Sequence, residues 1–317
     1  MGLLQVHSFV AGQWAAPADD AVPLHNAFTG ALIGYAGTGA PDVAAMYDHA
    51  LATGGPALRA MTFHDRARML KALAQYLSAR KNELYELSYL TGATKSDSWI
   101  DIDGGIGTTF VFASKGRREM PDAHVYLDGD VEMLSRHGSF VGQHVCTPLQ
   151  GVAVHINAFN FPVWGMLEKL APTLLAGMPT IVKPATVTGY LTEAAFRMII
   201  ESGLLPDGAV QLVSGRLGPL LDMLGPQDAV SFTGSAVTGV MLRGTPNLLE
   251  RSVRFSAEQD SLNATILGPD VTAGDPEFDL FVREAAGEIT AKAGQKCTAV
   301  RRILVPDALR RPVAEAL

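Results

Sequence analysis

The feature that most constrains the fold of this sequence is an alternation of strand-like and helix-like segments in its second half. Short apolar runs typical of buried strands alternate there with longer runs of helical periodicity. The strand-like runs lie at residues 151–156, 180–182, 210–213 and 229–232, and the helix-like runs begin near 163, 188 and 217. Because parallel strands must be joined by a crossover, usually a helix, this series predicts an α/β fold with a parallel sheet covered by helices on both faces.

The segments before this series follow other patterns. We expect a short strand pair at residues 9–14, an amphipathic helix at about 64–80 and a second helix at about 97–117. The first third of the chain is therefore predicted to be mostly helical. Between about 123 and 148, short alternating segments separated by glycines predict a small antiparallel excursion, an arm of the kind that often forms an oligomer contact.

A further region begins near residue 255. Its pattern predicts strands at 264–267 and 302–305 with a helix at about 277–293 between them. The last residues resemble the opening of a helix without a stop signal, so we expect the natural chain to continue.

The amino-acid composition and the net charge limit the classes of protein to which this chain can belong. Of the 317 residues, 48% are hydrophobic and 18% are charged, which indicates a globular chain with a large apolar interior and room for about two domains. The net charge of -7 provides no broad positive field for nucleic acid or an anionic membrane, so a small-molecule partner is expected. The two cysteines lack zinc-ligand spacing, and no signal peptide or long apolar span is evident. We therefore expect a cytoplasmic protein without a metal.

The two cysteines lie in different contexts. Cys297 follows Gly294-Gln295-Lys296 at a predicted helix-to-strand boundary. A free cysteine is most often a buried small hydrophobe, but this polar setting favours a nucleophile, because a reactive thiolate needs access and polar neighbours. Cys146 lies in an alternating strand-like stretch, which favours packing in the core or in a sheet.

Two further polar side chains have competing interpretations. Glu258 follows a strand-like run among small residues, where it is either a solvated loop carboxylate or a general base. Asn160 lies in an apolar strand-to-helix turn, where its amide either caps the helix or is presented to a substrate. From the residues alone, the helix cap is favoured for Asn160.

Two segments suit a phosphate-bearing ligand. Lys183 closes a strand at its carboxyl end, where open parallel sheets bind ligands, although a lone lysine is usually a solvated surface group. Residues 232–239 place glycine and serine between a strand and a helix start, where backbone N–H groups suit a pyrophosphate. This segment is not the Gly-x-Gly-x-x-Gly fingerprint.

In combination and in this order, the segments resemble the motifs of the aldehyde dehydrogenase superfamily. The motifs that carry the resemblance are residues 154–162 with Asn160, Lys183-Pro184-Ala185, Phe232-Thr233-Gly234-Ser235, Glu258 and Gly294-Gln295-Lys296-Cys297. The resemblance covers essentially the whole chain. Residues 54–63, 97–107 and 155–172 further resemble the dehydrogenase domain of the bifunctional phenylacetate-degradation family.

The resemblance implies the fold and its domains. It implies an aldehyde dehydrogenase-like α/β fold, with a Rossmann-type parallel sheet in an NAD(P)-binding domain at residues 1–255. The arm at about 123–148 would supply oligomerisation strands, and residues 256–317 would be the incomplete start of a second α/β catalytic domain. Full dehydrogenases of this type continue well beyond this point, with the rest of the catalytic domain, a glutamate that contacts the nicotinamide ribose and a strand donated to a neighbouring subunit.

The resemblance also implies roles for three residues. Cys297 would be the nucleophile that attacks an aldehyde, and the Asn160 amide with the Cys297 backbone N–H would hold the oxyanion. Glu258 would activate the water that releases the acid. A glutamate at this step favours hydrolysis over transfer of the acyl group to free CoA.

A set of residues is implied to contact the cofactor. These are Lys183, Ala185, Thr186, Gly215, Phe232, Thr233, Gly234, Ser235 and Gly239. Many relatives carry a glutamate that binds the adenosine ribose hydroxyls where this sequence has Thr186. Lys183 would then pair with a 2′-phosphate, so we predict NADP as the cofactor, with NAD as the alternative.

The implied function is the NADP-dependent oxidation of 3-oxo-5,6-dehydrosuberyl-CoA semialdehyde to its acid in aerobic phenylacetate catabolism. The partners would be a CoA-linked aldehyde and a second copy of the chain in a dimer, with a C-terminal hydratase half in the full-length protein. One alternative is a 3,4-dehydroadipyl-CoA semialdehyde dehydrogenase of benzoate catabolism, and another is an inactive fragment that only binds dinucleotide. A thiolase-like acyltransferase using Cys297 is disfavoured, because it would not need the cofactor features.

Overall fold

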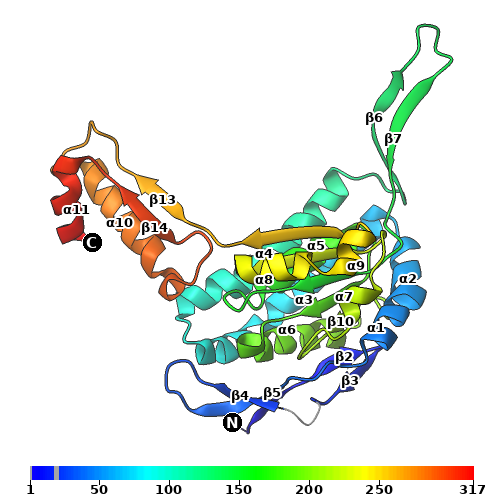
Figure 1. The fold of residues 1–317 in the computed structure, drawn as a ribbon, viewed down its shortest axis with the longest axis horizontal. Helices are drawn as coiled ribbons and strands as arrows, with labels where there is room; N and C mark the ends of the chain where they lie inside the picture. Colours follow the sequence, from blue (N-terminus) through cyan, green and yellow to red (C-terminus); the bar gives the residue numbers. More distant parts are fainter. Residues whose placement is uncertain (1, 18–20) are drawn as a thin grey trace. The chain divides into compact units, whose positions relative to one another are not determined.

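The computed structural model describes residues 2–17 and 21–317. The chain divides into two compact units, Met1–Glu258 and Gln259–Leu317 (Figure 1). None of the helices in the described ranges is both long enough and apolar enough to cross a bilayer.

The elements of the first unit follow in chain order. Its strands are β1 (Leu4–Val6), β2 (Ser8–Val10), β3 (Gln13–Ala15), β4 (Ala21–His25), β5 (Leu32–Gly37), β6 (Tyr126–Met133), β7 (Val141–Cys146), β8 (Ala153–Ile156), β9 (Thr180–Lys183), β10 (Val210–Leu212), β11 (Ala229–Gly234) and β12 (Arg254–Gln259). Its helices are α1 (Val43–His49), α2 (Gly55–Arg59), α3 (Phe63–Ser88), α4 (Lys95–Arg118), α5 (Trp164–Leu175), α6 (Gly189–Glu201), α7 (Leu220–Met223), α8 (Ala236–Arg243) and α9 (Pro246–Glu250), with short turns η1 (Ala50–Gly54), η2 (Tyr89–Thr91) and η3 (Thr186–Thr188).

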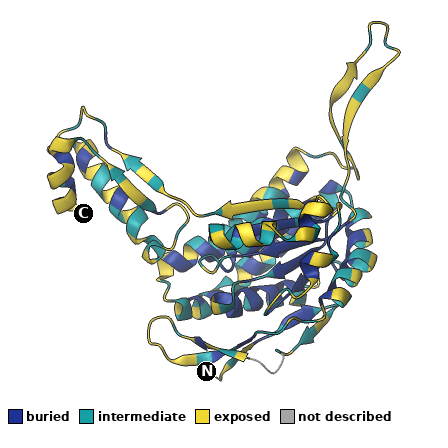
Figure 2. Cartoon of the chain, in the orientation of Figure 1, coloured by how far each residue is buried: buried dark blue, intermediate teal, exposed yellow. Residues whose placement is uncertain are grey.

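A seven-stranded sheet organises this unit among the described residues. Its strand order is β12-β11-β8-β9-β10-β2-β3, and β11, β8, β9 and β10 pair in parallel. Every residue of β8 and β10 is buried, as the continuous apolar runs require for strands covered on both faces. The predicted parallel sheet is confirmed, and its central strands are the dark band inside the helices in Figure 2.

Two hydrophobic clusters cover the two faces of the sheet. Val182 and Leu212 pack with residues of α3, α4, α5 and α6 on one face. Val154 and Ile181 pack with residues of α1, α7 and α9 on the other face. Successive strand residues point to opposite faces, so neighbouring Ile181 and Val182 belong to different clusters. The sheet is therefore doubly wound.

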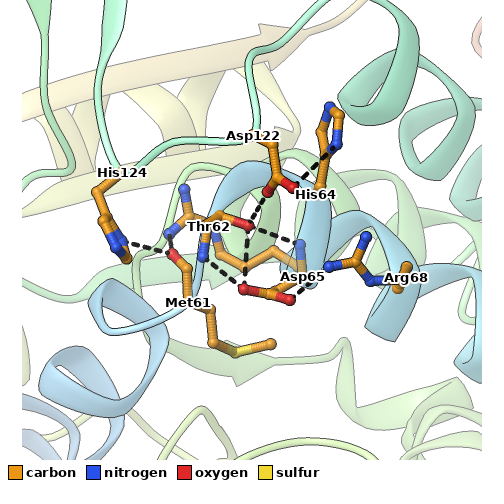
Figure 3. Close-up of polar contacts among 8 residues, drawn as sticks. Met61, Thr62, His64, Asp65, Arg68, Asp122 and His124 are labelled. Carbon is orange, nitrogen blue, oxygen red and sulfur yellow. Dashed lines mark hydrogen bonds and ion pairs between the residues drawn. The ribbon is translucent and has the colours of Figure 1, made fainter.

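The N-terminus of α3 is fixed by a reciprocal cap that also holds a distant loop (Figure 3). The Thr62 hydroxyl accepts from the Asp65 backbone N–H at 3.1 Å, and the Asp65 carboxylate accepts from the Thr62 backbone N–H at 3.0 Å. The Thr62 hydroxyl also donates to Asp122 at 2.6 Å, and the ring of His64 lies 3.7 Å from the same carboxylate. His124 donates to the Met61 carbonyl at 3.3 Å. These contacts attach the segment after α4 to the start of α3.

The segment after α4 leads into the antiparallel pair β6 and β7, which the alternating pattern predicted. Most of its residues are exposed (Figure 2), and they include several large hydrophobic side chains. Cys146 lies at the end of β7 and is exposed, so its predicted place in a sheet is correct and burial in the core is wrong. The residue lies on a two-stranded ribbon without a covering layer.

The second unit is a smaller α/β arrangement. Strands β13 (Asn263–Ile266) and β14 (Val300–Leu304) pair in parallel, and α10 (Pro276–Thr290) connects them through the turn η4 (Ala291–Gly294). The turn η5 (Asp307–Leu309) and α11 (Arg310–Ala316) follow β14. The buried residues of its small core are Leu267, Phe278, Leu309 and Val313.

The first third of the chain is mostly helical, as expected, although its helices begin only at α1 and the described residues before α1 form short strands. Two other sequence-based expectations need correction. Helix α3 continues to Ser88, beyond the expected end at 80, because Leu84 remains buried. Helix α7 has four residues instead of about eight, since Pro219 precedes it and its backbone becomes extended at Leu224.

Helix α4 contains glycines that differ in what surrounds them, which gives a matched test. A Cβ on Gly104 would lie 2.6 Å from the indole of Trp164 in α5, whereas one on Gly107 would meet nothing within 4 Å. We expect Gly104→Ala to lower the free energy of unfolding by about 1–3 kcal/mol through overpacking. Gly107→Ala should raise it by about 0.5–1 kcal/mol through helix propensity. Urea denaturation measures both, and equal effects would contradict the close packing of α4 on Trp164.

Candidate active site

The strand order places a ligand crevice at one edge of the sheet. The chain runs from β8 to β9 to β10 in one direction and then returns to add β11 on the other side of β8. In open parallel sheets, ligands bind at the carboxyl ends of the strands where the order reverses. The candidate crevice therefore lies beyond Ile156 of β8 and Gly234 of β11, with Lys183 one strand further along.

Lys183 is the last residue of β9 and is only partly exposed. Desolvation lowers its pKa from the ordinary lysine value. Among the described residues, no carboxylate lies within ion-pair distance of its ammonium group. A desolvated cation without a carboxylate partner at the carboxyl edge of a sheet suits an anionic ligand. Ala185 and Thr186 follow directly, at the start of η3.

The segment after β11 forms the N-terminus of α8. Ser235 is the N-cap of α8, and its hydroxyl accepts from the Thr238 backbone N–H at 3.2 Å. A Cβ on Gly234 would lie 2.6 Å from the ring of Phe232, which explains why glycine occupies this position. Because β8 separates β9 from β11, Lys183 and this helix start are two strand spacings apart, roughly 10 Å. One extended ligand at the sheet edge could contact both.

Two other cofactor candidates have structural roles in the fold. Gly215 has a φ of 127°, and its backbone approaches the Gly39 carbonyl too closely for any side chain. Gly239 is buried and donates its N–H to the Ser235 carbonyl at 2.9 Å. The contact with Gly39 explains why residue 215 is a glycine.

Asn160 lies in the turn between β8 and α5, which neighbouring elements hold from two sides. The Thr188 hydroxyl donates to the Phe159 carbonyl, and the Thr192 hydroxyl donates to the Pro162 carbonyl, each at 2.9 Å. The N-cap position of α5 is Val163, so Asn160 is not the helix cap that the residues alone favoured. The turn is thus fixed by contacts that do not require the Asn160 side chain as a cap.

The carboxylate of Asp101 in α4 caps α5 instead. It is almost completely buried and accepts the backbone N–H groups of Val163 at 3.2 Å and Trp164 at 2.8 Å. A negative charge at a helix N-terminus is favoured by the exposed N–H groups and the helix dipole. Sequence reasoning missed Asp101, because its partner lies about 60 residues further along the chain.

Glu258 lies within β12, at the edge of the large sheet, and not in a loop. Its side chain is exposed and lines a cavity of about 610 Å³ in the first unit. Five elements bound the cavity, namely α4, α5, β8, β11 and β12. The residues that line it are Thr108, Phe112, His155, Trp164, Glu168, Lys169, Pro172, Thr173, Ser231, Phe232, Thr233, Ser256, Ala257 and Glu258. Glu258 therefore shares a cavity with Phe232 and Thr233 of the segment proposed for the cofactor.

His155 is a buried residue of this cavity that sequence reasoning missed. Its side chain is 1% exposed, and one ring nitrogen, Nε2, lies 3.2 Å from the Thr173 hydroxyl. Burial, with a smaller contribution from the charge of Lys169, lowers the pKa of His155 to about 3. The imidazole is therefore neutral at physiological pH. The signal in the sequence was a single polar residue within an otherwise apolar strand.

Cys297 belongs to the second unit and is exposed, between η4 and β14. The turn before it is strained, because Lys292, Ala293 and Gly294 all have positive φ values of 52°, 53° and 74°. A left-handed conformation costs roughly 1–2 kcal/mol for a residue other than glycine. Strain of this kind is concentrated at functional sites, so the turn supports a functional role for the residue that follows it.

Hydrogen bonds hold the strained turn and the backbone of Cys297. Ser261 and Asn263 both donate to the Cys297 carbonyl from the segment that begins β13. Lys296, next to Cys297 in the chain, forms an ion pair with Glu288 of α10 at 2.7 Å. The backbone around the thiol is thus tied to both neighbouring elements of the second unit.

Comparison with known proteins is consistent across sequence and structure. The sequence model of the aldehyde dehydrogenase family matches residues 14–317. Over 315 residues the chain is 44% identical to the 3,4-dehydroadipyl-CoA semialdehyde dehydrogenase of Aromatoleum evansii, covering 99% of this chain and 61% of that protein. It is 27% identical to the N-succinylglutamate 5-semialdehyde dehydrogenase of Chromobacterium violaceum, covering 94% of this chain and 58% of that protein.

The fold of the chain also resembles that of a solved aldehyde dehydrogenase. A crystal structure of the betaine aldehyde dehydrogenase of Staphylococcus aureus, in complex with NAD+, superposes with a TM-score of 0.81 at 24% identity. The match covers 98% of this chain and 60% of that one. The chain therefore spans about three fifths of the length of these relatives.

The burial of His155 predicts a pH dependence of stability. Its pKa is about 3 in the folded chain and about 6.5 when unfolded, so its contribution is complete above pH 6.5 and is lost as the pH falls toward 3. Between pH 7 and pH 5 we expect the free energy of unfolding to fall by roughly 2 kcal/mol from this residue alone. In His155→Asn that component should disappear. Identical pH profiles for the two proteins in urea denaturation would show that the ring titrates normally.

Proposed function

Because this chain belongs to the aldehyde dehydrogenase family, we propose that it carries the cofactor site and the nucleophile of an enzyme that oxidises a CoA-linked semialdehyde to its acid. The observation that carries this proposal is the 44% identity, over almost the whole chain, to an enzyme named for a CoA-linked semialdehyde. Cys297 on its strained turn and Glu258 in a cavity support it.

The proposed reaction has two stages, and different residues of the chain act in each. In the first, the Cys297 thiolate forms a C–S bond to the aldehyde carbon, and the Asn160 amide with the Cys297 backbone N–H stabilises the resulting oxyanion. The carbonyl then re-forms as a hydride leaves the carbon, which gives a thioester. In the second stage, Glu258 takes a proton from water as that water attacks the thioester, and the C–S bond breaks to give the acid and the free thiolate.

A nicotinamide dinucleotide would supply the hydride acceptor. The crevice where the strand order reverses fits such a ligand, because it combines a desolvated cation, Lys183, with the helix N-terminus after Ser235. Ala185, Thr186 and Gly215 lie on the loops that follow β9 and β10, and Gly239 lies in α8. We propose NADP as the preferred cofactor, since Thr186 carries no charge that would repel a 2′-phosphate.

Two substrates suit this proposal. One is 3-oxo-5,6-dehydrosuberyl-CoA semialdehyde, of phenylacetate catabolism. The other is 3,4-dehydroadipyl-CoA semialdehyde, which the 44% identical relative favours. The exposed apolar residues of β6 and β7 support an oligomerisation role for this arm, and residues 1–255 and 256–317 are proposed as the cofactor-binding and catalytic parts.

The proposed chemistry predicts different defects for the two catalytic side chains. Cys297→Ala should abolish aldehyde-dependent formation of reduced cofactor, because no thioester can form. Glu258→Gln should still give one equivalent of reduced cofactor in a rapid burst, with later turnover slowed at least about a hundredfold, because water is no longer activated. Rapid-mixing absorbance of the reduced cofactor measures both. Dinucleotide binding without any turnover in the parent chain would support the fragment alternative instead.

The cofactor proposal predicts a selective effect at Lys183. Lys183→Ala should weaken NADP binding about tenfold or more and NAD binding less than about threefold, because only NADP carries the 2′-phosphate. The reciprocal variant Thr186→Glu should also weaken NADP binding, by charge repulsion, and leave NAD binding unchanged or tighter. Calorimetric titration gives the four affinities. An equal loss for both cofactors in Lys183→Ala would refute the phosphate pairing.

A further inference from the structure

The segment that carries Cys297 is a tight turn fixed within the second unit. Residues 296–299 form a hydrogen-bonded turn, in which the Ala299 backbone N–H donates to the Lys296 carbonyl at 3.0 Å. Ala299 is buried, at 1% exposure, whereas Cys297 is exposed. The turn therefore presents the thiol at the surface and is anchored by a buried residue at its end.

The hydrogen bond of this turn sets the direction of the Cys297 backbone N–H. A trans peptide group is planar, and its C=O and N–H point in opposite directions. The Lys296 carbonyl points into the turn, toward Ala299. The N–H of Cys297 belongs to the same peptide group and therefore points out of the turn. A donor with a fixed direction is the kind of group that stabilises a charge developing beside a thiol.

The next peptide group, between Cys297 and Thr298, is held by two side chains from the segment that opens β13. The Cys297 carbonyl accepts from the Ser261 hydroxyl and from the Asn263 amide, the latter at 2.5 Å. The Asn263 amide also donates to the Ala299 carbonyl at 3.2 Å. One amide group thus holds the carbonyl of the nucleophile and the carbonyl of the residue that ends the turn.

A bulge in the pairing of β13 with β14 lies at the same place. Asn263 pairs with Val300, and the register then shifts, so that Arg301 is one extra residue on β14. Bulges are common beside active sites, where they redirect side chains. The Arg301 guanidinium donates to the carbonyl of Gly294, in the strained turn before Cys297. Two residues at one bulge therefore hold the backbone before and after the thiol.

Packing and burial do not explain why donors occupy these positions. Ser261 is exposed and Asn263 is half-buried, and neither belongs to the small core of the second unit. Cys297 lies at the surface, where water can satisfy a backbone carbonyl. Side-chain donors are therefore not needed to satisfy that carbonyl. What they add is a fixed orientation of the turn.

We propose that Asn263, together with Ser261, positions the Cys297 turn so that the Cys297 backbone N–H faces the oxyanion that forms beside the thiol. This inference rests on the proposed function, because it takes Cys297 as the nucleophile. Asn263 is a positioning residue, since it acts through the turn and touches no reacting atom. Loss of its amide should slow reactions of the thiol that pass through an oxyanion and spare those that do not.

Two reagents that react with the same thiol separate these effects. p-Nitrophenyl acetate acylates a thiolate through a tetrahedral oxyanion, in which the new C–S bond has formed, and p-nitrophenolate then leaves with the electron pair of its C–O bond. Iodoacetamide alkylates a thiolate by direct displacement of iodide, without an oxyanion. Both rates are measured on the 317-residue chain carrying Cys146→Ser, so that Cys297 is the single thiol. Addition of Cys297→Ala to this chain provides the blank.

The proposal predicts a selective loss in this chain. Asn263→Ala should slow the first acylation about tenfold or more, because loss of an oxyanion donor altogether costs roughly a hundredfold or more. The alkylation rate should change less than about twofold. Asn263→Asp should behave in the same way, because a carboxylate cannot donate to a carbonyl. Ser261→Ala should give a smaller selective loss, and Ser261→Thr, which keeps the hydroxyl, should retain the parent rate.

Asn247 provides a matched control in the first unit. Its amide also holds two carbonyls, those of Leu221 at 2.9 Å and Leu224 at 2.8 Å. Asn247→Ala removes the same kind of contact far from Cys297 in the sequence. Urea denaturation should show a lower free energy of unfolding for this variant, whereas both reactions of Cys297 should keep their rates.

Several results would overturn the proposal. Equal slowing of acylation and alkylation in Asn263→Ala would show a general disturbance of the thiol, and an unchanged acylation rate would show that the amide has no part in it. Equal acylation rates in Ser261→Ala and Ser261→Thr, or no acylation of the parent thiol, would count against it as well. Should the Asn263 variants fail to fold, the two Ser261 variants decide the matter. The first acylation requires no cofactor, so the proposed function is judged separately by whether the parent chain forms reduced cofactor.

Discussion

The buried carboxylate of Asp101 is the interaction on which the geometry of the first unit's site depends. It lies in α4 and accepts the first backbone N–H groups of α5. That contact fixes where α5 begins, and therefore the turn that carries Asn160 and the position of Trp164. Gly104 and Gly105 complete the junction, because a side chain on either would collide with Trp164. One carboxylate and two glycines on α4 thus position Trp164, which lines the same cavity as Glu258.

Burial affects the charge of each polar group around this junction in a different way. Asp101 is buried and its charge is held by backbone donors, whereas His155 is buried and remains neutral because burial and the nearby charge of Lys169 disfavour its protonated form. Lys183 is desolvated, which lowers its pKa, and none of the ion pairs among the described residues involves it. The same physical cause, desolvation, therefore lowers the pKa of both His155 and Lys183.

The two units carry the two proposed catalytic side chains, Glu258 and Cys297, in different ways. In the first unit, Glu258 is carried on an edge strand, whose outward side chains need no loop to become accessible. In the second unit, Cys297 follows a turn with three left-handed residues, and its carbonyl is held by Ser261 and Asn263. A thiol beside a hydrogen-bonded but strained turn is held in place without being buried, which is compatible with the proposed nucleophile role.

The sequence by itself determined the parallel sheet, its order of strands and helices along the chain, and the family. Apolar runs, helical periodicity and the spacing of Asn160, Lys183, Glu258 and Cys297 are all local patterns. The tertiary structure alone decided which residues meet. Asp101 caps a helix about 60 residues away, and His155 joins Glu258 in one cavity only because β8, β11 and β12 lie side by side. Strand order and burial arise from long-range packing, so a local pattern could predict neither the neutral state of His155 nor the desolvation of Lys183.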